Sequence, residues 1–226
     1  MTSPRRDAPS PWRTRLRELP VFAPDTPGLD LDAAPAEPLA LLAGWLDDAI
    51  EAGALQPHAA SLATVDALGR PSVRTLILKD LDAESAWFAT HDASAKGRDL
   101  LGGSEAALLL YWRERGRQVR LTGPAERADA EVSAADFLAR HPEARARIIA
   151  APPSGPMPGE TEAAALVAAG RARLAEDPEL VDAGWGAWRV RPRELEFWAT
   201  SAEQGQVRLR YRRDDAGDWL RERLWP

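Results

Sequence analysis

The sequence predicts an α+β protein built around a β-rich sheet with flanking helices. Its 226 residues are 45% hydrophobic, which is enough to bury a sizeable core in one large domain. Runs of β-branched and apolar residues bounded by turn-forming residues fill the middle and the end of the chain, and alanine-rich stretches with helical spacing lie between them. No internal repeat or change of composition divides the sequence, so residues 37–226 are expected to form a single domain.

Residues 1–36 are expected to be a flexible arm outside that domain. The arm begins MTSPRRDAPSPWRTRLRELP, and its prolines disfavour a regular helix. A transit peptide is the alternative interpretation, but the same prolines work against the amphipathic helix of such a peptide. The domain then begins with a predicted helix at PLALLAGWLDDAIEAG (38–53), where apolar residues recur at helical spacing.

Strands are predicted next. The stretch SLATVDALGRPSVRTLILKDL (61–81) predicts two strands around a tight turn at Asp66–Gly69, because apolar runs flank a turn-forming cluster. SAWFAT (85–90) predicts a third strand. AALLLYW (106–112) and QVRLTGPAERA (118–128) predict a second hairpin across the polar connection RERGR, so the sheet has at least five strands by this point.

The rest of the chain contains predicted helices and then a return to strands. The helices are EVSAADFLARHP (131–142) and ETEAAALVAAGRARLAEDP (160–178), and the proline-rich APPSGPMPG between them is expected to be a loop. The last strands are predicted at AWRVRPRELEFWAT (187–200), VRLRYRR (207–213) and DWLRERL (218–224), with the final turn at Asp214–Gly217.

Composition argues against several classes of function. A net charge of −6 and a pI near 5.2 disfavour a nucleic-acid binder or a protein that binds anionic membranes. The chain has no cysteine, and its three histidines (His58, His91 and His141) lack ligand spacing, so no metal site is expected. No apolar run approaches the roughly 20 residues of a membrane span, and the start lacks the apolar core of a signal peptide. A cytoplasmic location is therefore expected.

Lysine is confined to one short segment. Among 29 basic residues only Lys79 and Lys96 are lysines, and both lie within RTLILKDLDAESAWFATHDASAKGRDLL (74–101). Asp92 or Ser94 is placed to cap a helix whose first turn contains Lys96. A cation there opposes the helix dipole unless an anion such as a phosphate lies nearby, whereas the alternative is an ordinary solvated lysine. Lys79 follows an apolar run, so its charge must leave the strand end or meet a partner.

Several motifs now carry a resemblance to a known family. They are LATVDALGRPSVRTLILK, WFATHDASAKGRDL, LLYWRERGRQVRLTGPAERA, ELEFW and RLWP, in that order. These motifs occur in the same order and at nearly the same spacing in the pyridoxamine 5′-phosphate oxidase family of FMN enzymes. The sequence therefore resembles this family over most of its length. Within the family it looks most like the flavin oxidases of phenazine biosynthesis. The resemblance implies a split β-barrel of the FMN-binding type and a homodimer, with FMN in two equivalent clefts between the subunits.

Family position also implies site residues. For FMN they are Arg74, Thr75, Leu76, Ile77, Leu78, Lys79, Thr90, Lys96, Gln118, Ser154, Trp198 and Arg208. Trp198 and Arg208 are expected to reach the flavin of the other subunit, although core packing and a solvated strand arginine are their ordinary alternatives. For a small-molecule substrate the implied residues are Lys79, Asp136, Arg140, Arg145, Gln204 and Gln206.

The sequence departs from the family at several places. The loop APPSGPMPG replaces a Gln-Ser that touches FMN in the family, which leaves Ser154 as the nearest equivalent, and Arg145 stands near the position of a substrate-binding serine. The family has an arginine directly before the lysine, but here Ala95 precedes Lys96. One phosphate contact is therefore missing unless Arg98 supplies it from the next turn. Asp136 stands at the position of a tyrosine that holds the substrate phosphate, and an aspartate repels a phosphate. The family's substrate-facing Arg-x-His falls on 204–206, which is Gln-Gly-Gln, although Arg210 or Arg212 is a possible substitute for the missing cation.

These features lead to one main expectation of function and two alternatives. The main expectation is an FMN-dependent oxidase that uses dioxygen and acts on a small, aromatic or heteroaromatic biosynthetic intermediate, for example of the phenazine type. The first alternative is a true pyridoxine/pyridoxamine 5′-phosphate oxidase that makes pyridoxal 5′-phosphate. The second is a non-catalytic or reductase-type split barrel that binds a flavin or haem.

Overall fold

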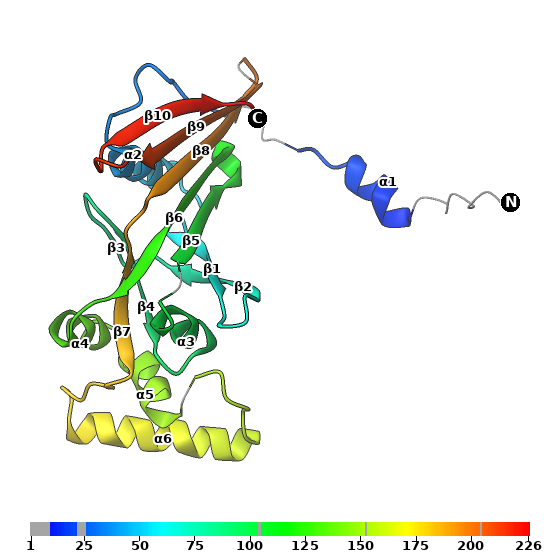
Figure 1. Ribbon diagram of the computed structural model, residues 1–226. Coiled ribbons are helices and arrows are strands. Elements are labelled where there is room, and N and C mark those ends of the chain that lie inside the picture. Colours follow the sequence, from blue (N-terminus) through cyan, green and yellow to red (C-terminus); the bar gives the residue numbers. More distant parts are fainter. Residues whose placement is uncertain (1–9, 22–25, 104, 152, 204) are drawn as a thin grey trace, which may run out of the picture.

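The computed structural model describes residues 10–21, 26–103, 105–151, 153–203 and 205–226. In these ranges ten strands form one antiparallel sheet that curls into a half-barrel, and six α-helices flank it (Figure 1). The predicted α+β class and the split-barrel architecture are therefore confirmed. No helix within the described ranges is long and apolar enough to cross a membrane.

The sheet has a main path and a branch. The main path runs β10–β9–β8–β6–β5–β1–β2, and the branch joins β6 to β7, β4 and β3. The strands are β1 (Ala59–Val65), β2 (Pro71–Ile77), β3 (Asp80–Leu81), β4 (Ala86–His91), β5 (Glu105–Trp112), β6 (Arg117–Arg127), β7 (Trp185–Val190), β8 (Glu194–Ser201), β9 (Gly205–Arg213) and β10 (Trp219–Leu224).

Strand β6 makes the half-barrel possible because it belongs to both parts of the sheet. Its first half, Arg117–Thr122, pairs with β8, and its last three residues, Ala125–Arg127, pair with β7. Gly123 lies at the switch, where a β-carbon would collide with the backbone carbonyl of Arg191. Only glycine allows the connection between β7 and β8 to cross this closely.

Apart from α1, the helices cover the sheet and its lower end (Figure 1). They are α1 (Pro11–Arg17), α2 (Pro38–Glu51), α3 (Ala95–Leu101), α4 (Ala130–Leu138), α5 (Pro142–Ala150) and α6 (Glu160–Glu176). Helix α2 buries Leu42 and Trp45 against the upper strands, where the ring of Trp45 packs edge-on against Phe197 with 5.2 Å between centroids. Helices α5 and α6 pack on each other at the opposite end of the molecule (Figure 1).

Most predicted elements match the structure, and two differ. The turn at Asp66–Gly69 is present, with Gly69 in the left-handed region at φ 77°. The single strand expected at 187–200 is instead two strands, β7 and β8, separated at Arg191–Arg193, where Pro192 lacks the N–H that a continuing ladder needs. Helix α5 was not predicted, and it begins with Pro142 after the N-cap His141.

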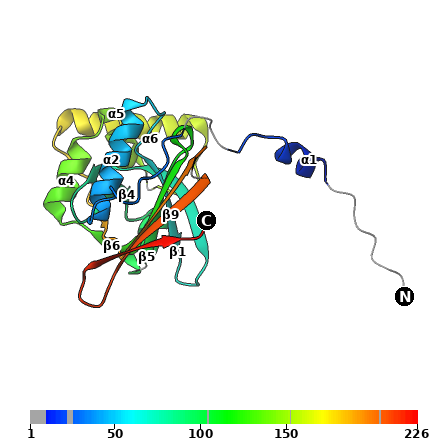
Figure 2. The ribbon, with the colours of Figure 1, turned by 90° about the horizontal axis from the view of Figure 1, so that it is seen from above.

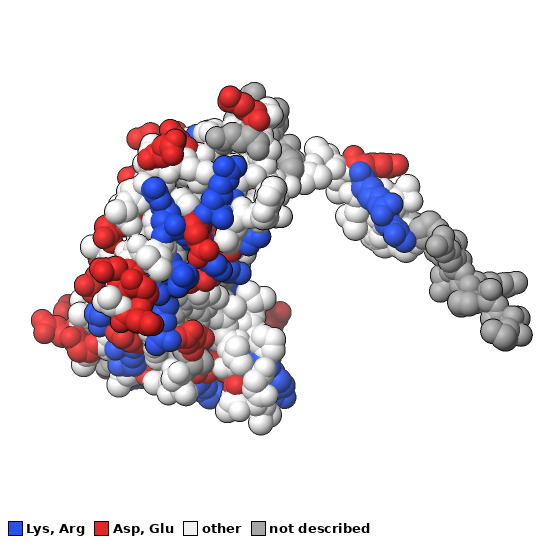
Figure 3. All heavy atoms as spheres, turned by 45° about the horizontal axis from the view of Figure 1, so that its top comes forward, with Lys and Arg blue, Asp and Glu red and all other residues white. Residues whose placement is uncertain are grey.

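The segment predicted to be a flexible arm has two different parts. Helix α1 stands away from the body of the molecule and carries basic side chains (Figures 1, 2 and 3). By contrast, Leu29 and Ala34 are buried in the main core. Pro35 accepts a hydrogen bond of 2.7 Å from the hydroxyl of Tyr211 in β9, so the last part of the predicted arm packs on the domain. Residues 1–9 and 22–25 lie outside the described residues.

Candidate functional site

The residues predicted to bind FMN fall on two different faces of the sheet. Successive side chains of a strand point to opposite faces, and directly paired residues share a face. Arg74 pairs with the buried Leu62 and so faces the core side, against which α3 packs. Gln118 precedes the buried Val119, so it faces the opposite, outer side. The two faces carry two separate groups of polar side chains.

The first group begins with Arg74 on β2. Its Nη1 donates to the hydroxyl of Thr64 at 2.7 Å and to the carbonyl of Leu62 at 3.2 Å. The Thr64 hydroxyl in turn donates to Asp99 of α3 at 2.6 Å, which links the strand to the helix. Burial lowers the pKa of Arg74, and Asp99 opposes that change. The guanidinium is thus held at the junction of β1, β2 and α3.

Lys96 joins the same group from the first turn of α3. The sequence places the turn by capping, because the Ser94 hydroxyl accepts from the N–H of Gly97 at 3.0 Å. Thr90 is buried, and its hydroxyl lies 3.1 Å from that of Ser94. A β-carbon at Gly97 would collide with the backbone of His91 and Asp92, so glycine allows the helix to start this close to β4.

Two cations meet in this group without a full counter-charge. Burial lowers the pKa of Lys96, and repulsion by Arg74 lowers it further. Among the residues that the structure describes, Lys96 forms no ion pair. A phosphate beside Lys96 and Arg74 would supply the missing negative charge, which makes this group a candidate anion site.

The loop between α5 and α6 also reaches this group. The Ser154 hydroxyl accepts from the backbone N–H of Ala95 at 3.4 Å, and Ser154 itself is in the left-handed region at φ 66°. Arg98, considered as a substitute for the family arginine, instead donates from its side chain to the carbonyl of Ala93.

The remaining predicted residues of β2 divide between the faces. Leu78 is buried in the core and Leu76 packs against it, whereas Thr75 and Ile77 point to the other face. Lys79 follows the strand, and its backbone N–H donates to the carbonyl of Trp87 at 2.8 Å while its side chain is exposed. The strand therefore presents Arg74 to α3 and Thr75 to the outer face.

The second group lies on the outer face of β5, β6, β8 and β9. Trp198 pairs directly with Gln118 on one side and with Arg208 on the other. A shallow cavity of about 360 Å³ opens over this group, lined by Tyr111, Gln118, Glu196, Trp198, Arg208 and Pro226. Gln206 contributes its side-chain oxygen to the indole N–H of Trp198 at 3.2 Å. Gln204 lies outside the described residues.

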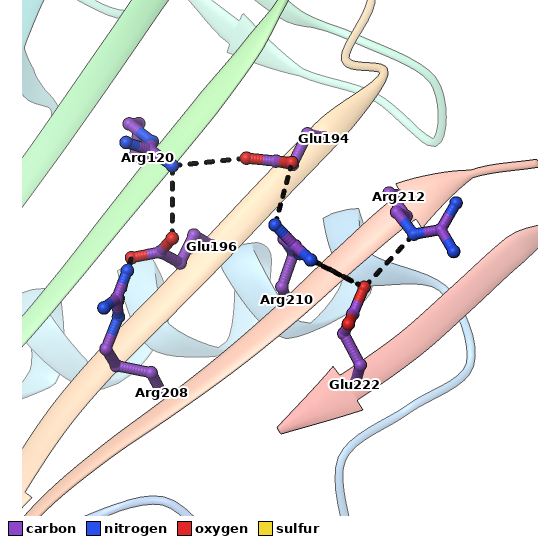
Figure 4. A network of polar contacts seen from close by, with 7 residues as sticks. All are labelled: Arg120, Glu194, Glu196, Arg208, Arg210, Arg212 and Glu222. Carbon is purple, nitrogen blue, oxygen red and sulfur yellow. Dashed lines mark hydrogen bonds and ion pairs between the residues drawn. The ribbon is translucent and has the colours of Figure 1, made fainter. Parts of the chain in front are cut away.

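Arg208 is fixed by Glu196, a residue that the sequence analysis did not single out. One carboxylate oxygen of Glu196 accepts from Arg208 Nη2 at 2.7 Å and from Nε at 3.1 Å, and the other accepts from Arg120 at 3.1 Å (Figure 4). Arg208 Nη1 also donates to the carbonyl of Trp225 at 3.1 Å. In the sequence, charged residues alternate along β8 and β9. Which arginine contacts Glu196 is defined only by the pairing of the two strands.

The arginines further along β9 are engaged elsewhere. Arg210 and Arg212 both pair with Glu222 of β10, at 2.9 and 3.1 Å, and Arg210 also lies 3.8 Å from Glu194 (Figure 4). Figure 3 shows basic and acidic side chains side by side on this part of the surface. Neither arginine lines the cavity beside Trp198.

The residues predicted to bind substrate are separated by the fold. Asp136 of α4 accepts from the indole N–H of Trp185 at 2.7 Å, and the guanidinium of Arg140 stacks 4.3 Å from the centroid of the same ring. Burial lowers the pKa of Arg140, whereas Asp136 raises it. Within the described part of the chain, Arg140 Nε is buried without a hydrogen-bond partner. Asp136 and Arg140 thus form a cluster around Trp185.

Arg145 takes a different place. It is buried, with 8% of its surface exposed, and its Nη2 donates to the carbonyls of Pro178 and Leu180 at 2.6 and 3.0 Å. Its guanidinium therefore ties α5 to the connection between α6 and β7. It also lies 5.4 Å from the ring centroid of Phe137, and that ring packs edge-on against Trp185 at 6.0 Å. No group of three or more potential metal ligands occurs among the described residues.

Comparisons with known proteins identify the family of the chain. The family model of pyridoxamine 5′-phosphate oxidase matches residues 46–169, and that of the pyridoxine 5′-phosphate oxidase C-terminal dimerisation region matches residues 185–226. A pyridoxine/pyridoxamine 5′-phosphate oxidase of Deinococcus deserti is 40% identical over 199 residues, which are 87% of this chain and 91% of the relative.

Two solved structures are also similar. PhzG from Burkholderia lata, solved in complex with tetrahydrophenazine-1-carboxylic acid, has a TM-score of 0.83 at 32% identity, over 89% of this chain and 100% of its own. A pyridoxamine 5′-phosphate oxidase-related, FMN-binding protein from Nostoc punctiforme has a TM-score of 0.66 at 20% identity, over 81% of this chain and 96% of its own. The second similarity concerns the fold alone.

Proposed function

The chain belongs to the pyridoxamine 5′-phosphate oxidase family, and from this premise we propose that it is an FMN-dependent oxidase. The substrate that we propose is a small aromatic or heteroaromatic biosynthetic intermediate bearing a carboxylate, with dioxygen as the electron acceptor. The observation that carries the cofactor assignment is the pair of Lys96 and Arg74, two partly buried cations: burial lowers the pKa of the lysine, and repulsion by the arginine lowers it further.

The first group of residues suits the phosphate end of FMN. Lys96 and Arg74 would supply positive charge, and the hydroxyls of Thr90 and Ser154 lie beside the same helix start. Charge-assisted hydrogen bonds from such cations to phosphate are among the stronger polar contacts in proteins. The chemistry of the donors therefore fits a phosphate monoester.

The second group suits the ring end. Gln118 offers an amide, Trp198 an indole face, and Arg208 a fixed positive charge to the shallow cavity. FMN, when bound, supplies redox chemistry by accepting a hydride equivalent that dioxygen later removes. Arg208 would stabilise negative charge on the reduced ring, and Trp198 would shield one side from water.

The two groups lie on opposite faces of one sheet, which supports a site shared between subunits. We propose a homodimer in which one subunit provides Arg74, Thr90 and Lys96 and the partner provides Trp198 and Arg208. The match of residues 185–226 to a dimerisation region supports this arrangement. Gln118 stands beside Trp198 in the same chain, so it is assigned to the second group.

The cluster around Trp185 supports a carboxylated substrate. The guanidinium of Arg140 lies over the indole and carries one positive charge, while Asp136 adds one negative charge nearby. A singly charged carboxylate meets less repulsion there than a phosphate dianion. The name of PhzG's bound ligand is that of a carboxylic acid, which is consistent with this class. Arg145 is left out of the proposal because its guanidinium is bonded inside the chain.

A true pyridoxine/pyridoxamine 5′-phosphate oxidase is the second candidate, because the Deinococcus relative carries that name at 40% identity. A visible spectrum of the purified protein, with mass analysis of the released cofactor, tests the flavin assignment that both candidates share. Anaerobic addition of substrate should bleach the flavin, and air should restore the colour. A colourless protein that does not take up FMN would contradict both candidates and favour another use of the fold.

A further inference from the structure

We propose that Glu196 is a positioning residue that orients Arg208 toward the cavity, and that Arg120 acts through Glu196 to set the effective positive charge there. The proposal deepens the proposed function and rests on it, because the quantity that would respond is the midpoint potential of bound FMN. The structure supports it through three features: the contacts by which Glu196 holds Arg208, the sharing of the buried carboxylate between two arginines, and the separate pairing of the neighbouring arginines.

The first feature is the way in which Glu196 holds Arg208. Glu196 lies on β8 and pairs with Arg210, so its carboxylate reaches diagonally to Arg208, two residues away on β9. Both Nε and Nη2 of Arg208 donate to the same oxygen, and Nη1 donates to Trp225 on the other side. A strand arginine without such contacts keeps several rotamers, whereas this guanidinium is held in one plane.

The second feature is that Glu196 is divided between two arginines. Its second oxygen accepts from Arg120 at 3.1 Å, and only 8% of the residue is exposed. Arg120 does not line the cavity, so it affects the cavity through the carboxylate between them. Three charges in this triad sum to +1, because one glutamate cannot neutralise two arginines. Removing Arg120 would leave Glu196 to neutralise Arg208 alone.

The third feature is that the other arginines of β9 have a carboxylate partner of their own. Arg210 and Arg212 are paired with Glu222. Glu194 contacts Arg120 at 3.2 Å and Arg210 at 3.8 Å but does not reach Arg208 (Figure 4). Glu194 is therefore a matched control for Glu196, since it sits on the same face of the same strand and shares Arg120.

The geometry predicts shifts of opposite sign for two substitutions. Glu196→Gln keeps an oxygen acceptor for Arg208 but removes the negative charge, so the protein should favour reduced over oxidised FMN about tenfold more, which is about 30 mV upward in midpoint potential for a two-electron couple. Arg120→Gln should move the same ratio about threefold in the opposite direction. Glu194→Gln should change it less than about twofold, because Arg208 keeps its contacts. A role limited to stability would not produce opposite signs.

The experiment measures the affinity of each variant for oxidised FMN by fluorescence quenching and the midpoint potential by equilibration with a redox dye. A separate measurement follows the Nε–H proton of Arg208 by NMR in the protein without flavin. Slow solvent exchange is expected in the wild type, and fast exchange in Glu196→Ala, with Glu194→Ala unchanged.

The outcomes are distinguishable. If the wild type binds FMN but the Glu196 and Arg120 substitutions shift the potential in the same direction or not at all, charge setting by the triad is overturned. If Glu196→Ala leaves the Arg208 Nε–H exchange slow, the positioning role is overturned. If the wild type binds no FMN, the proposed function fails and with it the redox part of this proposal, while the NMR measurement still decides whether Glu196 orients Arg208.

Discussion

Lys96 lies close enough to Arg74 for the charge of the arginine to add to burial in lowering the pKa of the lysine. The two residues come from different elements, the first turn of α3 and the middle of β2, and the hydrogen bond between Thr64 and Asp99 joins those elements. A fold that brings like charges together stores an unfavourable interaction that an anion relieves. The first two predictions follow from this pair.

Replacing Lys96 with alanine should weaken FMN binding by about 1–3 kcal/mol, the scale of a charge-assisted hydrogen bond. Binding of riboflavin, which lacks the phosphate, should change much less. Arg173→Ala, which removes an exposed charge from α6, is the matched control for the loss of one positive charge. Fluorescence titration measures all three, and equal affinity of the Lys96 variant and the wild type for FMN would remove Lys96 from the phosphate site.

As the pH rises, the affinity for FMN should begin to fall at a lower pH than it would at a site with an ordinary lysine. The phosphate favours protonated Lys96, so affinity is full below the pKa of the lysine in the free protein and declines as the pH rises through it. Because that pKa is lowered from 10.5, the decline starts at a lower pH, and binding takes up protons in that range. Lys96→Arg should keep its charge and move the decline upward. Titrations with FMN and with riboflavin across alkaline pH measure how the affinity of each protein depends on pH. Identical FMN profiles for the wild type and Lys96→Arg would contradict the assignment.

Complementation tests whether the site is shared. Two kinds of subunit, each with its own affinity tag, are coexpressed: one carries Lys96→Ala and the other Arg208→Ala. They should form mixed dimers. If each site takes Lys96 from one subunit and Arg208 from the other, random pairing restores roughly a quarter of all sites. Titration of the mixture should then show a minority of tight sites that neither homodimer has. Their absence from purified mixed dimers would place both residues in the site of one subunit.

Turnover should distinguish the two substrate classes. Asp136 puts negative charge beside Arg140, and Gln206 is bonded to Trp198, so pyridoxine and pyridoxamine 5′-phosphates should be poor substrates compared with a dihydrophenazine carboxylate. Oxygen uptake measures this, and a kcat/KM of roughly 10⁴ M⁻¹s⁻¹ or more with either phosphate would restore the vitamin-oxidase assignment. Arg140→Ala should lower kcat/KM for the carboxylate more than for a neutral analogue, whereas the exposed Arg147→Ala should not discriminate between them.

Tyr211→Phe should destabilise the fold by about 1 kcal/mol, because the substitution leaves the Pro35 carbonyl without its 2.7 Å hydrogen bond. Tyr211 is fully buried, whereas Tyr111 is more than half exposed, so Tyr111→Phe is the control and should stay within about 0.5 kcal/mol of the wild type. Urea unfolding measures both. Equal midpoints for the two variants would show that the contact to Pro35 contributes no stability.

Local sequence signals predicted most of the fold. Turn chemistry located Asp66–Gly69, and apolar spacing located α2, because both depend on neighbouring residues. The break between β7 and β8 was missed, although Pro192 marks it, because the apolar pattern continues on both sides. The docking of residues 26–36 could not be predicted, since contacts such as that of Pro35 with Tyr211 join positions 176 residues apart.

The candidate site could be predicted only as a set of residues. The lysine-bearing segment and the family motifs named Lys96, Arg74, Trp198 and Arg208 as candidates, but they did not show that the two pairs lie on opposite faces. That division depends on strand register, as does the role of Glu196. Arg145 was assigned to the substrate by family position, and the sequence did not show that its guanidinium donates to the carbonyls of Pro178 and Leu180.

The docking of the early segment onto the late strands has a consequence for biosynthesis. The Thr26 hydroxyl bonds the carbonyl of Thr200, and Arg221 bonds the carbonyl of Ala34, across 174 and 187 residues. On a ribosome that adds about 5–20 residues per second, residues 26–36 emerge roughly ten seconds or more before their partners. These two hydrogen bonds can therefore form only after β8 and β10 have been synthesised, so the early segment waits for these partners through most of translation.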